Sequence, residues 1–338
     1  MKEIHGSYDR DRHTVTTFTS GNFAYTLEPN YGNLPDGFDL MMFPSGCCDD
    51  EDNLFLTSRH LDHPIVMLDA EGNYVRDFGK GLFAETHGIC VTPEGTLLCA
   101  DTGLHVIREL TKTGEHIRDL GTLGKPSDSG YDGNAWRRMQ RRGFMIPTDV
   151  PYKDNASWVF YEGVLSIKRA AEPFNRPTGV CVAPNGNIYV SDGYGNAAVH
   201  RFTRDGELIR TWGGPGHEPG KFIVPHCIWA DKENRIWVGD REGNKINIFD
   251  EDGELIGCVT DGLYQPTEIF ADEDYIYVVE RGGGLTIFNM DMEIEVQLGY
   301  FNSPIRAHGM CGDSKGNLYF MPLTTYDCHY LMKLSPCR

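Results

Sequence analysis

The sequence predicts an all-β fold, a six-bladed β-propeller, and three observations support this. A unit of about 40 residues recurs through the 338-residue chain, and a period of about that length with four strands per unit is typical of propellers. Apolar runs within each unit are joined by turns such as Asp205-Gly206, which connect antiparallel strands. One key position also returns at constant spacing, because 41 residues separate His226 from Thr267 and Thr267 from His308.

Each unit is expected to contain an inner strand after the key position, a second strand that ends at an acidic residue, and two outer strands joined by an Asp-Gly turn. In a single domain spanning residues 1–338, the six blades are expected at 37–80, 82–121, 174–214, 222–260, 263–298 and 303–336. The alternating pattern of residues 13–28 predicts a strand that closes the ring against the last blade. Closure of this kind removes exposed strand edges.

Residues 122–173 interrupt the repeat between the second and third blades. Loops this long within a compact domain are typically functional, so the insertion is a candidate lid over the mouth of the ring. Four arginines lie within Arg137–Arg142 and would neutralise an anionic substrate in an otherwise acidic protein. A solvated loop and a subunit contact are the alternatives.

The composition limits the classes of partner. The net charge of −18 and the pI near 5.0 argue against nucleic acid, because no basic surface offsets the repulsion of phosphates. The chain lacks the run of about 18 apolar residues that a membrane span needs. Residues 1–7 lack the apolar core of a signal peptide, which predicts a cytoplasmic protein.

The ten cysteines form no Cys-x-x-Cys pair and are expected to be reduced. The sequence does not predict an oligomeric state.

Histidine occupies the key position in every second unit. His87, His226 and His308 stand in the second, fourth and sixth units, while Thr178 and Thr267 take the same place in the third and fifth. In a closed ring, alternate units lie a third of a turn apart, so the three imidazoles can point at the axis together. Three neutral imidazoles with open positions are the ligand set of a catalytic zinc, and other divalent transition metals also accept them.

Further polar side chains are expected around these histidines, at the mouth of the ring. Arg59, Tyr194, Arg241 and Arg281 follow the second strand of their units. A phenol beside a divalent metal can act as a general base, and arginines bind carboxylates through two hydrogen bonds. The two threonines at the key position are candidate substrate contacts. The acidic residues that recur at the end of the second strand are expected to cap turns.

Two stretches carry a family resemblance. Residues 174–180 with 191–196, and residues 220–226 with 238–242, are similar to the peptidyl-α-hydroxyglycine α-amidating lyases. The likeness covers residues 44–320. These enzymes are six-bladed propellers of NHL repeats that cleave an N-acyl hemiaminal into an amide and glyoxylate.

The resemblance implies a role for each site residue. It implies that the three histidines of the key position hold zinc, that Tyr194 removes the proton of the substrate hydroxyl, and that Arg59 and Arg241 bind the substrate carboxylate. The chain departs from the family at two positions. Gly309 stands where the family has a calcium-binding aspartate, so a structural calcium is doubtful. Gly195 replaces a cysteine of a family disulfide.

These observations favour a metal-dependent lyase. The expected reaction is cleavage of a C–N or C–O bond at a hydroxyl-bearing carbon of a small anionic molecule, with Tyr194, Arg59 and Arg241 as catalytic residues. Arg59, Arg241 and Arg281, with Thr178 and Thr267, would bind the substrate. A metal-dependent hydrolase or lactonase at the same site is an alternative, and a non-enzymatic NHL-type binding platform is another.

Overall fold

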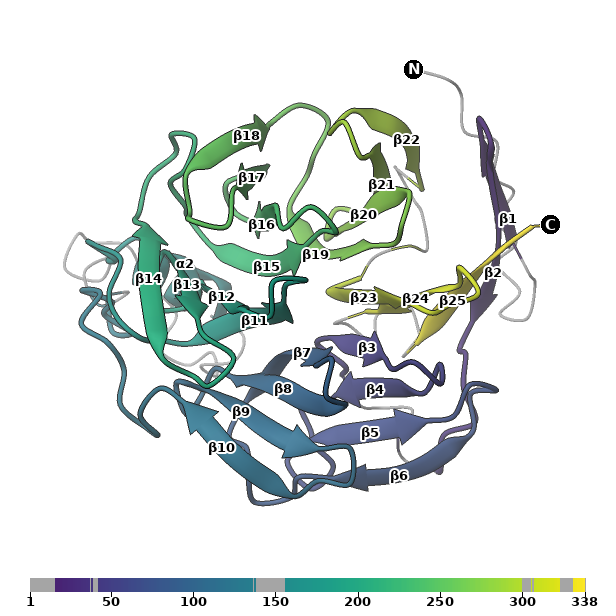
Figure 1. Ribbon diagram of the computed structural model, residues 1–338, viewed down its shortest axis with the longest axis horizontal. Coiled ribbons are helices and arrows are strands. Elements are labelled where there is room, and N and C mark those ends of the chain that lie inside the picture. Colours follow the sequence, from purple (N-terminus) through teal and green to yellow (C-terminus); the bar gives the residue numbers. More distant parts are fainter. Residues whose placement is uncertain are drawn as a thin grey trace.

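The computed structural model describes residues 16–36, 38, 42–135, 137, 156–299, 305, 307–322 and 331–337. In this part of the chain, six antiparallel sheets surround a central axis like the blades of a propeller (Figure 1). The predicted fold class is confirmed. Each blade is one repeat in sequence, except the last, which takes strands from both ends of the chain.

Blades one to five each have four strands in chain order from the axis outwards. Blade one holds β3 (Gly46–Cys48), β4 (Leu54–Thr57), β5 (Ile65–Leu68) and β6 (Tyr74–Phe78). Blade two holds β7 (Thr86–Val91), β8 (Thr96–Asp101), β9 (Val106–Thr111) and β10 (His116–Leu120). Blade three holds β11 (Pro177–Val182), β12 (Ile188–Asp192), β13 (Ala198–Phe202) and β14 (Leu208–Gly213). Blade four holds β15 (Pro225–Ala230), β16 (Ile236–Asp240), β17 (Lys245–Phe249) and β18 (Leu255–Val259). Blade five holds β19 (Pro266–Ala271), β20 (Tyr275–Glu280), β21 (Gly284–Asn289) and β22 (Ile294–Leu298).

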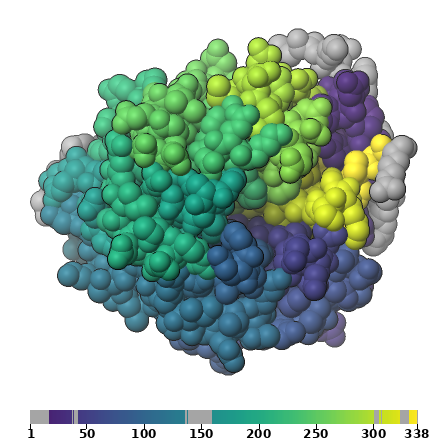
Figure 2. Space-filling model, viewed as in Figure 1, coloured from purple at the N-terminus to yellow at the C-terminus, as the bar shows by residue number. Residues whose placement is uncertain are grey.

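The sixth blade closes the ring. Its inner strands are β23 (Gly309–Gly312), β24 (Leu318–Met321) and β25 (Met332–Pro336), and β2 (Phe23–Pro29) and β1 (Thr16–Ser20) complete it. Leu27 of β2 pairs with Leu334 of β25, so the N- and C-terminal segments lie side by side (Figure 2). The predicted closing strand is confirmed. It is a hairpin rather than one strand, because Gly21 adopts a left-handed φ of 58° and turns the chain.

The apolar core lies between neighbouring blades. Trp212 of blade three packs against Phe249 of blade four with ring centroids 5.8 Å apart, and Trp237 of blade four packs against Phe288 of blade five. Trp237, Phe249 and Phe288 are fully buried, and burying each such side chain stabilises the fold by roughly 1.5–3 kcal/mol. The nine described cysteines are free, as expected from their spacing.

The described part of the insertion packs against the mouth of the ring. Its helix α2 (Ala156–Val164) brings Val164 into a small buried cluster with Tyr194 and Val224. Residues 138–155, with most of the arginine run, lie outside the described residues. Among the residues that the structure describes, no helix is both long and apolar enough to cross a membrane.

Candidate metal centre and substrate site

The key position lies where the pairing of the inner two strands shifts by one residue. Pro225 pairs with Asp240 but Cys227 pairs with Gly239, so His226 is the extra residue between them. The same shift occurs at the key positions of β7, β11 and β19. Bulges of this kind bend a strand and re-aim a side chain. In these four blades the shift therefore re-aims the side chain at the key position.

The three predicted histidines meet at the axis. One nitrogen atom from each lies within 4.8 Å of the others, among His87, His226 and His308. Each side chain is 2% exposed, and the Nε2 atoms of His226 and His308 are 3.1 Å apart. The sequence prediction that these residues converge is thus realised in the geometry.

Backbone carbonyls of the next blade fix the orientation of each imidazole. Nδ1 of His226 donates to the Thr267 carbonyl (2.8 Å), Nδ1 of His308 donates to the Pro44 carbonyl (2.7 Å), and His87 does the same to Thr178. This contact holds the proton on Nδ1 and leaves the Nε2 lone pair at the axis.

The imidazoles are kept neutral by their surroundings. Burial lowers the pKa of His87, His226 and His308 well below the ordinary value of 6.5. The positive charges of Arg59 and Arg241 lower the pKa of His87 and His308 further. A neutral imidazole with its lone pair exposed is the form that binds a divalent metal, so the donor set fits zinc.

The two threonines of the key position support the histidines. The Thr178 hydroxyl donates to the Pro225 carbonyl (2.8 Å), next to His226, and the Thr267 hydroxyl donates to the Ala307 carbonyl (2.9 Å), next to His308. Both threonines are buried. Because their hydroxyls are engaged with backbone atoms, the structure places them as supports between blades rather than as free substrate contacts.

Tyr194 reaches the same point from the turn after β12. Its hydroxyl oxygen lies 2.9 Å from Nε2 of His87, 2.9 Å from Nε2 of His226 and 3.3 Å from Nε2 of His308. The phenol oxygen is therefore next to all three candidate ligand atoms. A proton donor or acceptor at this point can exchange a proton with a group bound by the histidines.

Arg241 holds the Tyr194 hydroxyl from the other side. Its Nη1 donates to that oxygen over 3.1 Å, and the guanidinium lies over the rings of Tyr194 and Phe160, the latter from α2. Burial opposes the charge of Arg241, but the nearby Tyr194 and Glu242 outweigh it and raise its pKa above the usual value. A permanent positive charge beside the phenol oxygen can stabilise negative charge that develops at the site during a reaction.

Glu242, which the sequence did not single out, anchors this arginine. Its carboxylate accepts hydrogen bonds from Nε of Arg241 (2.8 Å), the Tyr161 hydroxyl (3.0 Å) and Nε2 of Gln265 (2.9 Å). Nη1 of Arg281 lies 3.9 Å from the same carboxylate. We call Arg241, Glu242 and Arg281 the Glu242 cluster. It ties helix α2 to the mouth.

A second group of the same composition lies across the mouth. Nη1 of Arg59 lies 2.9 Å from one oxygen of Glu85, and Nη2 of Arg176 donates to the other over 3.1 Å. We call Arg59, Glu85 and Arg176 the Glu85 cluster. Arg176 has a left-handed φ of 67°, which costs roughly 1–3 kcal/mol in a non-glycine residue and is typical of functional sites. Its backbone N–H donates to Nδ1 of His105.

One register signal would have found Glu85 and Arg176. Both stand two residues before a key position, as Gln265 does before Thr267. The acidic residues that end the second strands hold these loops, because Asp101 accepts the backbone N–H groups of Ala84 and Glu85. Asp240 does the same for Ile223 and Val224, so the expected capping role is what the structure shows.

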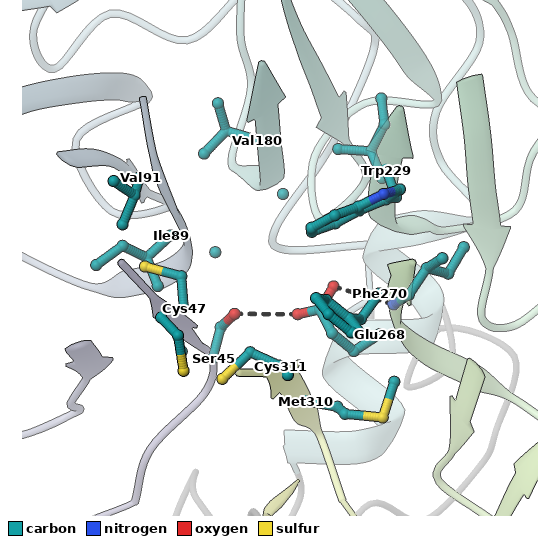
Figure 3. A pocket seen from close by; sticks show the side chains of 17 residues that line it. Ser45, Cys47, Ile89, Val91, Val180, Trp229, Glu268, Phe270, Met310 and Cys311 are labelled. Carbon is teal, nitrogen blue, oxygen red and sulfur yellow. Dashed lines mark hydrogen bonds between the residues drawn. The ribbon is translucent and has the colours of Figure 1, made fainter. Parts of the chain in front are cut away.

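The axis also contains a cavity of about 120 Å³, lined by residues that follow the key positions on the inner strands. Figure 3 shows Glu268 in this cavity with Ser45, whose hydroxyl donates to its carboxyl over 3.0 Å. Burial raises the pKa of Glu268 to about 8. Gly309 holds the equivalent position in blade six, where a Cβ would lie 2.5 Å from the Pro44 carbonyl oxygen. A side chain at this position would therefore require the Pro44 backbone to shift.

Comparisons with known proteins agree with this picture. Residues 174–202, which hold β11, β12 and β13, match the NHL repeat family. A probable peptidyl-alpha-hydroxyglycine alpha-amidating lyase of Caenorhabditis elegans is 27% identical over 189 residues, 55% of this chain and 42% of that protein. The chain resembles the amidating lyases. This confirms the resemblance stated from the sequence.

Two further comparisons show how far the similarity to known proteins extends. The human NHL repeat-containing protein 3 is 32% identical over 160 residues, 44% of this chain and 46% of that protein. The chain thus spans under half the length of these two curated relatives. A virginiamycin B lyase from Staphylococcus aureus matches 92% of this chain and 99% of its own with a TM-score of 0.58. At 16% identity this likeness shows the fold alone.

Proposed function

We propose that the protein is a metal-dependent lyase that breaks a C–N or C–O bond at a hydroxyl-bearing carbon of a small anionic substrate. One observation carries this: the Tyr194 hydroxyl lies within 3.3 Å of the Nε2 atoms of three buried, neutral histidines and accepts a hydrogen bond from Arg241. This arrangement joins a metal-ligand set to a proton acceptor and a fixed positive charge.

The triad of His87, His226 and His308 would hold the metal, and zinc suits three neutral imidazoles. Other divalent transition metals bind the same ligands. A bound divalent metal supplies Lewis acidity, which lowers the pKa of a substrate hydroxyl. The protein's part is to keep the imidazoles neutral and aimed, which their burial and their Nδ1 contacts achieve.

Tyr194 would accept the proton of the substrate hydroxyl. As the O–H bond breaks, its electrons form the carbonyl, and the bond from that carbon to the leaving nitrogen or oxygen breaks. The leaving group then takes a proton, so the products are a carbonyl compound and an amide or alcohol, and no water is consumed. Arg241 supports this step because its charge stabilises the phenolate.

The arginines of the two clusters would bind the anionic end of the substrate. Arg241 is 4% exposed, and a guanidinium in a site with little water binds a carboxylate more strongly than in solution. The side chain of Arg281 is 48% exposed and so remains open to a ligand. This supports the expectation of a small anionic partner and of a site on one face of the ring.

A product assay tests the proposal. Zinc-loaded protein is incubated with N-acyl-α-hydroxyglycines and with other 2-hydroxy acids that carry an acylamino or alkoxy group on the hydroxyl-bearing carbon, and carbonyl release is followed by trapping with a hydrazine. Esters and lactones are offered in parallel. We expect release that the Tyr194→Phe variant lacks. Hydrolysis of esters or lactones without any carbonyl product would instead support the hydrolase alternative. Neither product from any zinc-loaded sample would favour a binding platform.

A further inference from the structure

The mouth carries more positive charge than one carboxylate needs. Each of the two clusters contains two guanidinium groups around a single carboxylate: Arg59 and Arg176 around Glu85 and, in the second cluster, Arg241 and Arg281 around Glu242. Both clusters are therefore left with an excess of one arginine, although the chain as a whole has a net charge of −18. Arginines gathered in this way in an acidic protein indicate an anionic ligand.

The two clusters lie on different sides of the metal triad. The Glu85 cluster is built from the loops around β4, β7 and β11, in blades one to three, and the Glu242 cluster from the loops after β16 and β20, in blades four and five. Blades two and five face each other across the axis (Figure 1). Arg241 lies close to the triad, because its Nη1 donates to the Tyr194 hydroxyl, which lies 2.9 Å from Nε2 of both His87 and His226.

Each cluster keeps capacity for a ligand. Nε of Arg176 is buried and has no acceptor among the described residues, and a buried donor without a partner is rare in native structures. Arg281 reaches Glu242 only at 3.9 Å and its side chain is about half exposed. Arg241 is held more firmly than Arg281, since it donates to both Glu242 and Tyr194.

We infer that the substrate carries two anionic groups, as in a derivative of a 2-hydroxy dicarboxylic acid, with one group at each cluster and the hydroxyl-bearing carbon between them at the triad. This inference rests on the proposed function, because it places the reacting carbon beside Tyr194. It also departs from the relatives, since the substrate that names them, peptidyl-alpha-hydroxyglycine, has its carboxylate on one side only. Two anionic groups explain why arginines stand on both sides of the axis.

Simple 2-hydroxy acids test this inference without knowledge of the substrate. Binding of glycolate and lactate, with one carboxylate, is compared with that of tartronate, malate and 2-hydroxyglutarate, with two, by titration calorimetry on zinc-loaded protein. The zinc content measured after each titration shows that the ligand has not removed the metal. We expect at least one dicarboxylate to bind about tenfold or more tightly than lactate at low ionic strength, where charge pairs are least screened.

Variants locate the second anionic group. Arg176→Gln and Arg281→Gln each remove one guanidinium from one cluster. Each is expected to remove most of the dicarboxylate preference, because a dicarboxylate uses both clusters, whereas lactate affinity should fall in at most one of the two variants. Arg210→Gln is the matched control, because Arg210 pairs with Glu254 on an outer strand, and it should retain the preference. If lactate binds as tightly as every dicarboxylate, the two-anion inference is wrong and the proposed function stands. If neither lactate nor any dicarboxylate binds to zinc-loaded protein, both the two-anion inference and the proposed function are wrong.

Discussion

The hydroxyl oxygen of Tyr194 lies 2.9 Å from Nε2 of His226, although 32 residues separate them in the chain. The tyrosine comes from the turn after the second strand of blade three, and the histidine comes from the bulged inner strand of blade four. Two neighbouring repeats thus supply a proton acceptor and a metal ligand to one point. The predictions below follow from this contact and from the groups that hold it.

Tyr194→Phe separates catalysis from metal binding. The phenol is expected to accept a proton, and loss of a general base typically lowers rates about 100- to 10,000-fold. The variant should keep its metal, because the three histidines are unchanged. Carbonyl release and metal content are measured together, with Tyr189→Phe as the control, whose hydroxyl donates to the Glu251 carbonyl in blade four. Carbonyl release at the wild-type rate would show that the phenol is not the base.

Glu242→Gln should weaken both the fold and the seating of helix α2. The carboxylate of Glu242 is 6% exposed and accepts three hydrogen bonds, and hydrogen bonds to a charged group contribute about 1.5–3 kcal/mol. We expect unfolding in urea to show a loss of about 2 kcal/mol, with faster hydrogen exchange in α2. The control Glu254→Gln breaks only an exposed pair with Arg210 and should change stability by under about 1 kcal/mol. Equal losses in the two variants would contradict this account.

Thr178→Val tests the support between blades. The hydroxyl of Thr178 lies 2.8 Å from the Pro225 carbonyl and is buried, so its removal leaves a buried acceptor without that donor, at about 1–3 kcal/mol. Because Pro225 precedes His226, zinc affinity should also fall, about 10- to 100-fold as for other residues that orient metal ligands. Competition with a zinc chelator measures this. Thr260→Val, at an exposed threonine, serves as the control. Unchanged zinc affinity in Thr178→Val would show that Thr178 does not support the metal ligand His226.

Glu268 makes stability depend on pH. Its pKa is raised from 4.5 to about 8 in the folded protein by burial, so the folded state keeps a proton that the unfolded state has lost between these values. The stabilisation is complete below about pH 4.5 and is lost as the pH rises towards 8, by at most roughly 1.4 kcal/mol per pH unit. Urea unfolding with a chelator present should show this fall at pH 7, 7.5 and 8. This range lies above the ordinary histidine pKa of 6.5, below which the buried neutral histidines give an opposite trend. Glu268→Gln should flatten it, and the same slope in both proteins would rule Glu268 out as the cause.

The metal triad could be predicted from the sequence because register in a repeat fold is set by covalent spacing. Residues 41 apart, such as His226 and Thr267, occupy the same place in neighbouring blades. Glu85 could have been found from its place two residues before a key position. Glu242 could not, because its partner Tyr161 lies in the insertion, at a separation that no period relates. The contact of Tyr161 with Glu242 depends on how α2 packs, and residues 122–173 have no repeat from which to infer it.

The closing hairpin was only half predicted for a similar reason. Residues 13–28 alternate as one strand would, and the left-handed backbone of Gly21 decides that the chain turns there. The threonines show a different limit. Thr178 and Thr267 occupy the histidine position, which suggested a contact with substrate, but only the structure shows that their hydroxyls bond to carbonyls of the next blade.

Metal content tests the central claim most directly. Wild-type protein, the His226→Ala variant and a His217→Ala control at an exposed histidine are purified without chelator, supplied with zinc, dialysed and analysed by elemental mass spectrometry. The account predicts about one zinc or other transition metal per chain in the wild type and the control, and its loss in His226→Ala. A wild type that takes up no metal, or a His226→Ala variant that keeps it, would contradict the assignment of His87, His226 and His308 as a metal centre.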